Sequence, residues 1–229
     1  MRTFVFSLGG SLICPDGISE SYIDQFRRLL HDVRDRDVRI YIVVGGGSIA
    51  REYQQSLRVV SPEVDHDTLD LLGIAATRVN ASILAALLDA PMPVPCSPDE
   101  AFAIHDSQFV VMGGWKPGFS TDTVSVYLAQ KSNAGAVYNF SNVSHIYDKD
   151  PRTYSDAAPI DELSWDQYFR LFQDLSWKPG LHAPFDPIAS KLASENLLRV
   201  YIANGQNPDI IRDIVGGVTN TVAIGTVIG

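Results

Sequence analysis

The stretch 110–123, Val-Val-Met-Gly-Gly-Trp-Lys-Pro-Gly-Phe-Ser-Thr-Asp-Thr, predicts a strand, a glycine turn and the start of a helix. The apolar run Phe109–Met112 is typical of a buried strand. It breaks at Gly113-Gly114, and Ser120 opens a helical pattern that ends near Lys131. Backbone N–H groups at a helix start have no partner in the helix and point outward, so this place suits a phosphate.

Two further glycine loops follow apolar runs, at Gly9-Gly10-Ser11 and at Gly45-Gly46-Gly47-Ser48. Neither is a Walker A loop or a G-x-G-x-x-G fingerprint, because the required lysine or glycine spacing is missing. Arg51 lies one turn into the helix expected after the second loop and could reach an anion there. Three such loops in one short chain suggest a protein that holds several phosphates at once.

Strand and helix patterns alternate along the chain, which predicts an α/β fold with a largely parallel sheet covered on both faces. We expect strands at 4–8, 39–44, 108–112, 136–140 and 198–203, and a terminal hairpin at 221–228. We expect helices at 18–33, 48–60, 65–90, 120–131 and 164–173, and from 186 and 207 onward. Ligands of such sheets bind beyond the carboxyl ends of the strands, where all three glycine loops lie.

The predicted helix 65–90 carries an apolar stripe that includes Val79 and Leu87. Beside it, Asp70 and Thr77 are seven residues apart on one face, which Arg78 and Asn80 flank. These polar groups could bind a sugar or a base, or they could be a solvated helix face. Spacing alone favours the solvated face.

The 229 residues carry a net charge of −9, which argues against nonspecific binding to nucleic acid or acidic membranes. Cys14 and Cys96 lack metal-ligand spacing and are expected to be buried thiols in a reducing cytoplasm. No run approaches the roughly 18 apolar residues of a membrane span. We therefore expect a soluble, cytoplasmic protein.

Seven motifs in order resemble the amino acid kinase superfamily, and within it the archaeal-type uridylate kinases, which transfer a phosphoryl group from ATP to UMP. The motifs are Ser-Leu-Gly-Gly-Ser (7–11), Val-Val-Gly-Gly-Gly-x-x-Ala-Arg (43–51), Asp-x-x-Gly-Ile-x-x-Thr-Arg-x-Asn-Ala (70–81), Gly-Gly-x-x-Pro-Gly-x-Ser-Thr-Asp (113–122), Asn-Val-x-x-x-Tyr-x-x-Asp-Pro (142–151), Asp-Pro-x-Ala-x-Lys (186–191) and Gly-Thr-Val-Ile (225–228). They span essentially the whole chain.

This resemblance implies one amino acid kinase-like domain over residues 1–229, a three-layer αβα sandwich with a mostly parallel sheet. The N-terminal part would bind the acceptor and the C-terminal part the nucleotide donor. It further implies Mg²⁺ carried by the ATP phosphates rather than by protein ligands, ATP and UMP as substrates, and no nucleic acid or membrane partner. A hexamer built as a trimer of dimers is expected.

The resemblance also implies roles for individual residues. The ATP-binding positions would be Gly10, Ser11, Gly47, Arg51, Ser141, Tyr147 and Asp150. The UMP-binding positions would be Gly46, Asp70, Trp115, Lys116, Pro117, Gly118, Phe119, Ser120 and Thr121. The catalytic positions would be Lys191, which would neutralise charge in the transition state, together with Ser11 and Gly10.

Three departures from the family pattern leave alternatives open. Ser7 replaces a lysine that many members carry, Ser144-His145 replaces Asp-Gly in the donor pocket, and Trp115-Lys116 makes the acceptor loop bulkier and more basic. The alternatives are a related phosphotransferase for a carboxylate or an isoprenoid phosphate, and a non-catalytic nucleotide- or oxyanion-binding storage or sensor protein.

Overall fold

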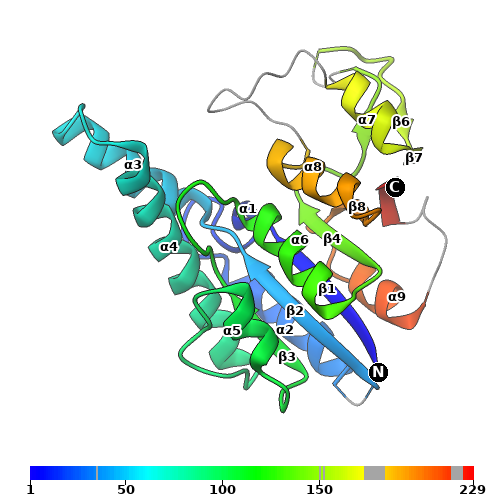
Figure 1. Cartoon of the computed structure of the whole chain (residues 1–229), viewed down its shortest axis with the longest axis horizontal. Coiled ribbons are helices and arrows are strands. Elements are labelled where there is room, and N and C mark those ends of the chain that lie inside the picture. Colours follow the sequence, from blue (N-terminus) through cyan, green and yellow to red (C-terminus); the bar gives the residue numbers. More distant parts are fainter. Residues whose placement is uncertain (35, 150, 152, 173–183, 218–223) are drawn as a thin grey trace.

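The structure, a computed structural model, describes residues 1–34, 36–149, 151, 153–172, 184–217 and 224–229. Its main sheet contains β1 (Arg2–Leu8), β2 (Val38–Val44), β3 (Phe109–Met112), β4 (Ala136–Ser141), β7 (Glu162–Leu163), β8 (Arg199–Asn204) and β9 (Gly225–Ile228). Within the described residues the strand order is β3-β2-β1-β4-β8-β9-β7 (Figure 1). A separate ribbon pairs β5 (Ile146–Tyr147) with β6 (Pro159–Ile160).

The strands β3, β2, β1, β4 and β8 are all parallel, so their carboxyl ends meet at one edge of the sheet. β9 is antiparallel to β8 and parallel to β7. The mostly parallel sheet predicted from the sequence is therefore confirmed. The predicted terminal hairpin is wrong in its described part, because β9 pairs with the distant strands β8 and β7; residues 221–223 lie outside the described residues.

Helices cover both faces of the sheet, which confirms the three-layer αβα sandwich (Figure 1). Alternate side chains of β1 enter the two cores: Phe6 and Leu8 pack in one, Val5 in the other. The first core is covered by α1 (Gly10–Ile13), α2 (Glu20–Asp32), α4 (His66–Leu87) and α9 (Ile210–Gly216). The second core is covered by α5 (Pro98–Ala103), α6 (Thr121–Ser132), α7 (Trp165–Leu171) and α8 (Pro187–Glu195).

Helix α3 (Gly47–Val60) packs along α4, and the pair projects from one end of the sheet (Figure 1). Gln54 joins them by donating from Nε2 to the Leu69 carbonyl at 2.9 Å. By length and hydropathy alone α4 could cross a membrane, so the expectation that no segment comes close to such a span is wrong. In this structure 44% of its apolar window is buried inside the protein.

The predicted apolar stripe of α4 is wrong at Val79 and Leu87, which are exposed. Thr77 and Asn80 are buried instead. The helix is therefore rotated so that part of its polar face meets the protein. Its start agrees with the sequence, since the Asp65 side chain accepts the Thr68 N–H as an N-cap.

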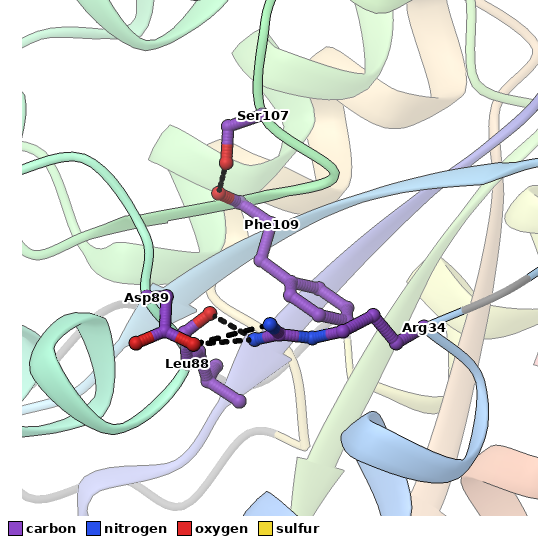
Figure 2. Close-up of polar contacts among 5 residues, drawn as sticks. All are labelled: Arg34, Leu88, Asp89, Ser107 and Phe109. Atoms are coloured by element: carbon purple, nitrogen blue, oxygen red, sulfur yellow. Dashed lines mark hydrogen bonds and ion pairs between the residues drawn. The ribbon is translucent and has the colours of Figure 1, made fainter.

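The carboxyl end of α4 is fixed at the far edge of the sheet by Arg34 (Figure 2). The guanidinium donates to the Leu88 carbonyl at 2.7 Å, pairs with Asp89 at 3.1 Å and lies over the Phe109 ring at 5.8 Å. Because Phe109 begins β3, this cluster ties α4 to the amino end of that strand. The helix is thus held to the sheet away from the glycine loops.

The structure differs from the sequence-based expectations at helix α5 and at Cys96, and part of one predicted helix lies outside the described residues. Helix α5 was not predicted, although Ser97-Pro98 is a good helix start and the Ser97 side chain caps it. Cys96 is exposed, whereas Cys14 is buried as expected. The end of the helix predicted at 164–173 lies outside the described residues.

Candidate active site

The first two glycine loops pack backbone to backbone at the carboxyl edge of the sheet. Leu8 and Val44, the last residues of β1 and β2, are register partners. A Cβ atom on Gly10 would overlap the backbone nitrogen of Gly47, and one on Gly45 would overlap that of Gly10. Side chains are therefore excluded at these positions, and main-chain amides of two loops lie close together.

Several of these amides have no internal partner. The N–H of Gly9 donates to the Phe140 carbonyl at 2.8 Å, and that of Gly45 to Leu8 at 2.9 Å. Among the described residues, no acceptor is found for the N–H groups at positions 10, 11, 46 and 47. Unpaired amides gathered from two loops form a natural site for an anion.

The third loop, which follows β3, is held by α4. Thr77 Oγ1 accepts the Gly114 N–H at 2.6 Å, and Arg78 donates to the carbonyls of Gly114 at 3.2 Å and Trp115 at 3.0 Å. Asp70 Oδ2 accepts the Gly118 N–H at 2.8 Å. The expectation of a solvated polar face on this helix is therefore wrong: these side chains bind the neighbouring loop.

Aromatic rings and one cation line the same loop. The ring of Trp115 lies 5.1 Å from Phe119 and 5.6 Å from Tyr127 of α6. The Lys116 amine lies 4.1 Å from the Trp115 ring centre and 4.5 Å from that of Phe119. Cation–π attraction holds this amine beside the loop. An apolar aromatic wall with a positive charge at its edge suits a planar, negatively charged molecule.

The remaining residues of the loop lead into α6. Pro117 is half-buried and Thr121 is the first residue of the helix. The Ser120 side chain accepts the Thr123 N–H at 3.1 Å and so serves as the N-cap. The helix start predicted from the sequence is confirmed at this point.

Two acidic residues that the sequence does not assign to the site lie next to each other at the starts of α6 and α8. Asp122 Oδ1 accepts the Ser7 hydroxyl at 2.9 Å, and Oδ2 accepts the Asp186 N–H at 3.2 Å. Although Asp122 keeps some exposed surface, burial of its carboxyl raises its pKa to about 6, and the nearby Asp186 charge adds to this shift. The Ser-Thr-Asp helix start was the available signal, but acidic residues are common in a first helical turn.

Lys191 and Arg51 stand apart from these contacts. Lys191 is on α8, its side chain is 77% exposed, and its amine is 3.9 Å from Glu195 of the same helix. Arg51 is exposed on α3. Within the described part of the chain, neither side chain hydrogen-bonds to a glycine loop.

The donor-side positions surround the end of β4. Ser141 Oγ accepts the Val143 N–H at 3.1 Å, and the Tyr147 hydroxyl is 3.5 Å from Ser144 Oγ. Asp150 lies outside the described residues. No group of three or more His, Cys, Asp and Glu side chains that could hold a metal occurs in the part of the chain that the structure describes.

Comparison with known proteins gives one consistent result. The model of the amino acid kinase family matches residues 2–204. The chain is 36% identical to the uridylate kinase of Thermoplasma volcanium (89% of this chain, 88% of that protein) and 35% identical to that of Methanocaldococcus jannaschii (94% and 96%). The crystal structure of uridylate kinase from Archaeoglobus fulgidus superposes with a TM-score of 0.84 at 32% identity, covering all of both chains. UMP kinase from Bacillus anthracis, at 19% identity and a TM-score of 0.76, shares the fold and covers all of this chain and 96% of its own.

Proposed function

Because the chain belongs to the amino acid kinase family, we propose that it is a UMP kinase, which transfers the γ-phosphoryl group of ATP to UMP to give UDP and ADP. The observation that carries this proposal is identity of 31–36% to archaeal uridylate kinases over at least 89% of the chain. The placement of three glycine loops at one sheet edge supports it, since two nucleotides must bring their phosphates together.

The unpaired amides of Gly10, Ser11, Gly46 and Gly47 bind the facing phosphates in this proposal. Phosphoryl transfer depends mainly on positioning and charge stabilisation, and backbone dipoles fixed before the reaction supply both. Gly10, Ser11 and Gly47 serve the ATP side, with Arg51 over the loop. Gly46 serves the UMP side.

Uridine and its phosphate bind against α4 and the loop after β3. The ring of Trp115 offers a stacking surface, and the Lys116 amine offers a charge that can move from the aromatic rings to a phosphate. Asp70 accepts a hydrogen bond from the Gly118 amide and directs its second oxygen to the acceptor. The rest of the loop, positions 117–121, closes around the nucleotide.

The donor nucleotide binds at the ends of β4 and β5, with Ser141 and Tyr147 lining the adenine and ribose site, to which the sequence resemblance also assigns Asp150. Lys191 neutralises the charge of the transferring phosphoryl group. No catalytic base is needed, since an acceptor phosphate is already nucleophilic at neutral pH. Mg²⁺ would be carried by the ATP phosphates as part of the substrate and would offset part of their negative charge.

We further propose a single domain over residues 1–229 whose N-terminal part binds UMP and whose C-terminal part binds ATP. The enzyme would work in the cytoplasm, in pyrimidine nucleotide biosynthesis, as a hexamer built from dimers. Exposed apolar side chains on the packed helices α3 and α4 support association of several copies, because burying apolar surface against a partner is favourable. They include Tyr53, Val60, Leu71 and Val79. Light scattering of the purified protein tests the assembly.

An acceptor panel tests the activity. The purified protein is incubated with MgATP and UMP, CMP, isopentenyl phosphate, glutamate or aspartate, and ADP formation is followed. We expect UMP to give the highest kcat/KM by at least about tenfold, because each lost polar contact costs about that factor. A higher kcat/KM for another acceptor would replace UMP in the proposal. Tight ATP binding without ADP formation for any acceptor would favour a storage or sensor protein.

A further inference from the structure

The amide side chain of Asn80 holds the glycine loop that follows β2. Its Nδ2 donates to the carbonyls of Gly45 at 3.0 Å and Gly46 at 3.1 Å. In a trans peptide the N–H points opposite to the C=O. By drawing these two carbonyls toward α4, Asn80 therefore turns the N–H groups of Gly46 and Gly47 away from the helix, toward the loop after β1.

Backbone hydrogen bonds hold the two ends of the loop, from the Gly45 N–H to Leu8 and from the Ser48 N–H to Cys14, but among the described residues none holds the two peptides between them. Glycines have no side chains and adopt many backbone conformations, and Gly47 has a φ of +67° that favours glycine. A peptide that flipped would present a carbonyl oxygen where a phosphate must bind. An outside restraint on both peptides is thus needed for a lasting anion site.

Asn80 is also not the side chain that stability alone would favour. It is 1% exposed, and within the described residues its Oδ1 has no hydrogen-bond partner. A buried acceptor without a partner is destabilising. Such exceptions in native proteins are expected at functional sites. The amide is therefore better explained by what its nitrogen holds.

Thr77, one helical turn earlier, holds the next loop from the same face of α4. Its Oγ1 accepts the Gly114 N–H and donates to the Ile74 carbonyl at 2.6 Å. Its methyl group would lie 3.6 Å from a Cβ on Gly46. Thr77 is thus bonded to one loop and lies beside the other. Since the far end of α4 is fixed by Arg34 (Figure 2), the helix is a rigid support for them.

We propose that Asn80 is a positioning residue for phosphoryl transfer, because it directs the Gly46 and Gly47 N–H groups toward the facing phosphates. Thr77 fixes the position of the Gly113-Gly114 turn beside them. This inference rests on the proposed function, and it identifies the side chains that join the two glycine loops into one site. Neither residue contacts the substrates in this arrangement.

Asn80→Asp tests the first part, because the new side chain has the same shape but turns an acceptor toward two carbonyls. We expect kcat to fall by about tenfold or more, and by a larger factor than either KM rises, since aligned amides act most on the transition state. Leu84→Ala is the matched control, because Leu84 is fully buried one turn further along α4. It should lower the melting temperature at least as much and keep kcat within about twofold.

Thr77→Val and Thr77→Ser test the second part and do not depend on the folding of the first variant. Valine keeps the shape but removes the acceptor for the Gly114 N–H. We expect Thr77→Val to raise the KM for UMP by about fivefold or more and to leave the KM for MgATP within about twofold. Thr77→Ser, which keeps the hydroxyl, should restore the KM for UMP.

The inference is overturned if Asn80→Asp keeps wild-type kcat, if Leu84→Ala loses kcat in parallel with it, or if the two Thr77 variants behave alike. If Asn80→Asp does not fold, the KM values for UMP of Thr77→Val and Thr77→Ser test the proposal instead. If the wild-type protein did not phosphorylate UMP, the proposed function itself would fail. Asn80 would then be judged by the rise in melting temperature with MgATP, which Asn80→Asp should reduce by at least about half and Leu84→Ala should keep. An unreduced rise in Asn80→Asp would overturn the inference.

Discussion

The carboxylate of Asp70 accepts a hydrogen bond from the Gly118 amide at 2.8 Å, and so joins the first half of α4 to the loop after β3. Residues 48 positions apart thereby form one wall of the candidate acceptor site. One carboxylate oxygen is occupied by the protein, which fixes the direction of the other. The contact also means that a change at Asp70 affects both the loop and the substrate.

Asp70→Asn should weaken UMP binding. The neutral amide can still accept the Gly118 N–H, but it loses a charged acceptor worth about 1.5–3 kcal/mol to a substrate hydroxyl. We expect the KM for UMP to rise by about tenfold or more and the KM for MgATP to stay within about twofold. Asp67→Asn, an exposed position in the first turn of α4, is the control. Equal increases in both KM values would remove Asp70 from the acceptor site.

Lys191→Ala should lower kcat by about 100-fold with little change in either KM, because loss of a transition-state charge partner has effects of that order. The exposed contact of Lys191 with Glu195 is worth little, so stability should hardly change. Lys131→Ala, which removes a surface pair with Asp99, controls for loss of a lysine. An unchanged kcat would exclude Lys191 from the reaction centre.

Lys116→Met keeps an apolar side chain beside Trp115 and Phe119 but removes the charge. We expect the KM for UMP to rise by about threefold to tenfold at low salt, as for an exposed cation that contacts a phosphate. The difference from wild type should shrink as salt is added, because salt screens the attraction. A KM that is independent of Lys116 at every salt concentration would show that the amine serves the loop alone.

Asp122 should make stability depend on pH in a particular direction. Its folded pKa is raised from 3.8 to about 6 by burial. Between about pH 4 and 6 the unfolded carboxyl is ionised while the folded one keeps its proton, so stability falls as pH rises through this window. The loss is at most about 3 kcal/mol, since one pKa unit is about 1.4 kcal/mol.

Urea unfolding of the wild type and of Asp122→Asn measures this effect. The free energy of unfolding of the wild type should decrease relative to that of the variant between about pH 4 and 7. The comparison with the variant removes the contributions of other carboxylates, such as Asp24 and Asp65. Their pKa values are lowered, so their contribution to stability changes with pH in the opposite direction. Two parallel curves would mean that the Asp122 carboxyl titrates normally.

Chelation of the divalent ion with EDTA should abolish turnover, because MgATP is the proposed donor and the metal offsets much of the phosphate charge. Activity should return when Mg²⁺ is added in excess of the chelator. Full activity in EDTA, without restored metal, would contradict the proposed mechanism. The far-UV circular dichroism of the protein should be the same in both conditions.

Local sequence patterns determined the layers of the fold and the position of the glycine loops. Apolar runs such as Phe4–Leu8 and Val38–Val44 form strands, and Ser120 and Asp186 cap the helices that follow. These features depend on near neighbours, so they can be read along the chain. Alternation of strands and helices then predicted the parallel sheet and its binding edge.

Only the tertiary structure decided how that edge is held together. The same polar pattern on α4 fits a solvated face or a binding face, and the rotation of the helix against β2 and β3 buries Thr77 and Asn80 against the loops. The meeting of Ser7 with Asp122 likewise joins residues 115 positions apart. Such contacts arise from the packing of whole elements, a property that the periodicity of one segment does not contain.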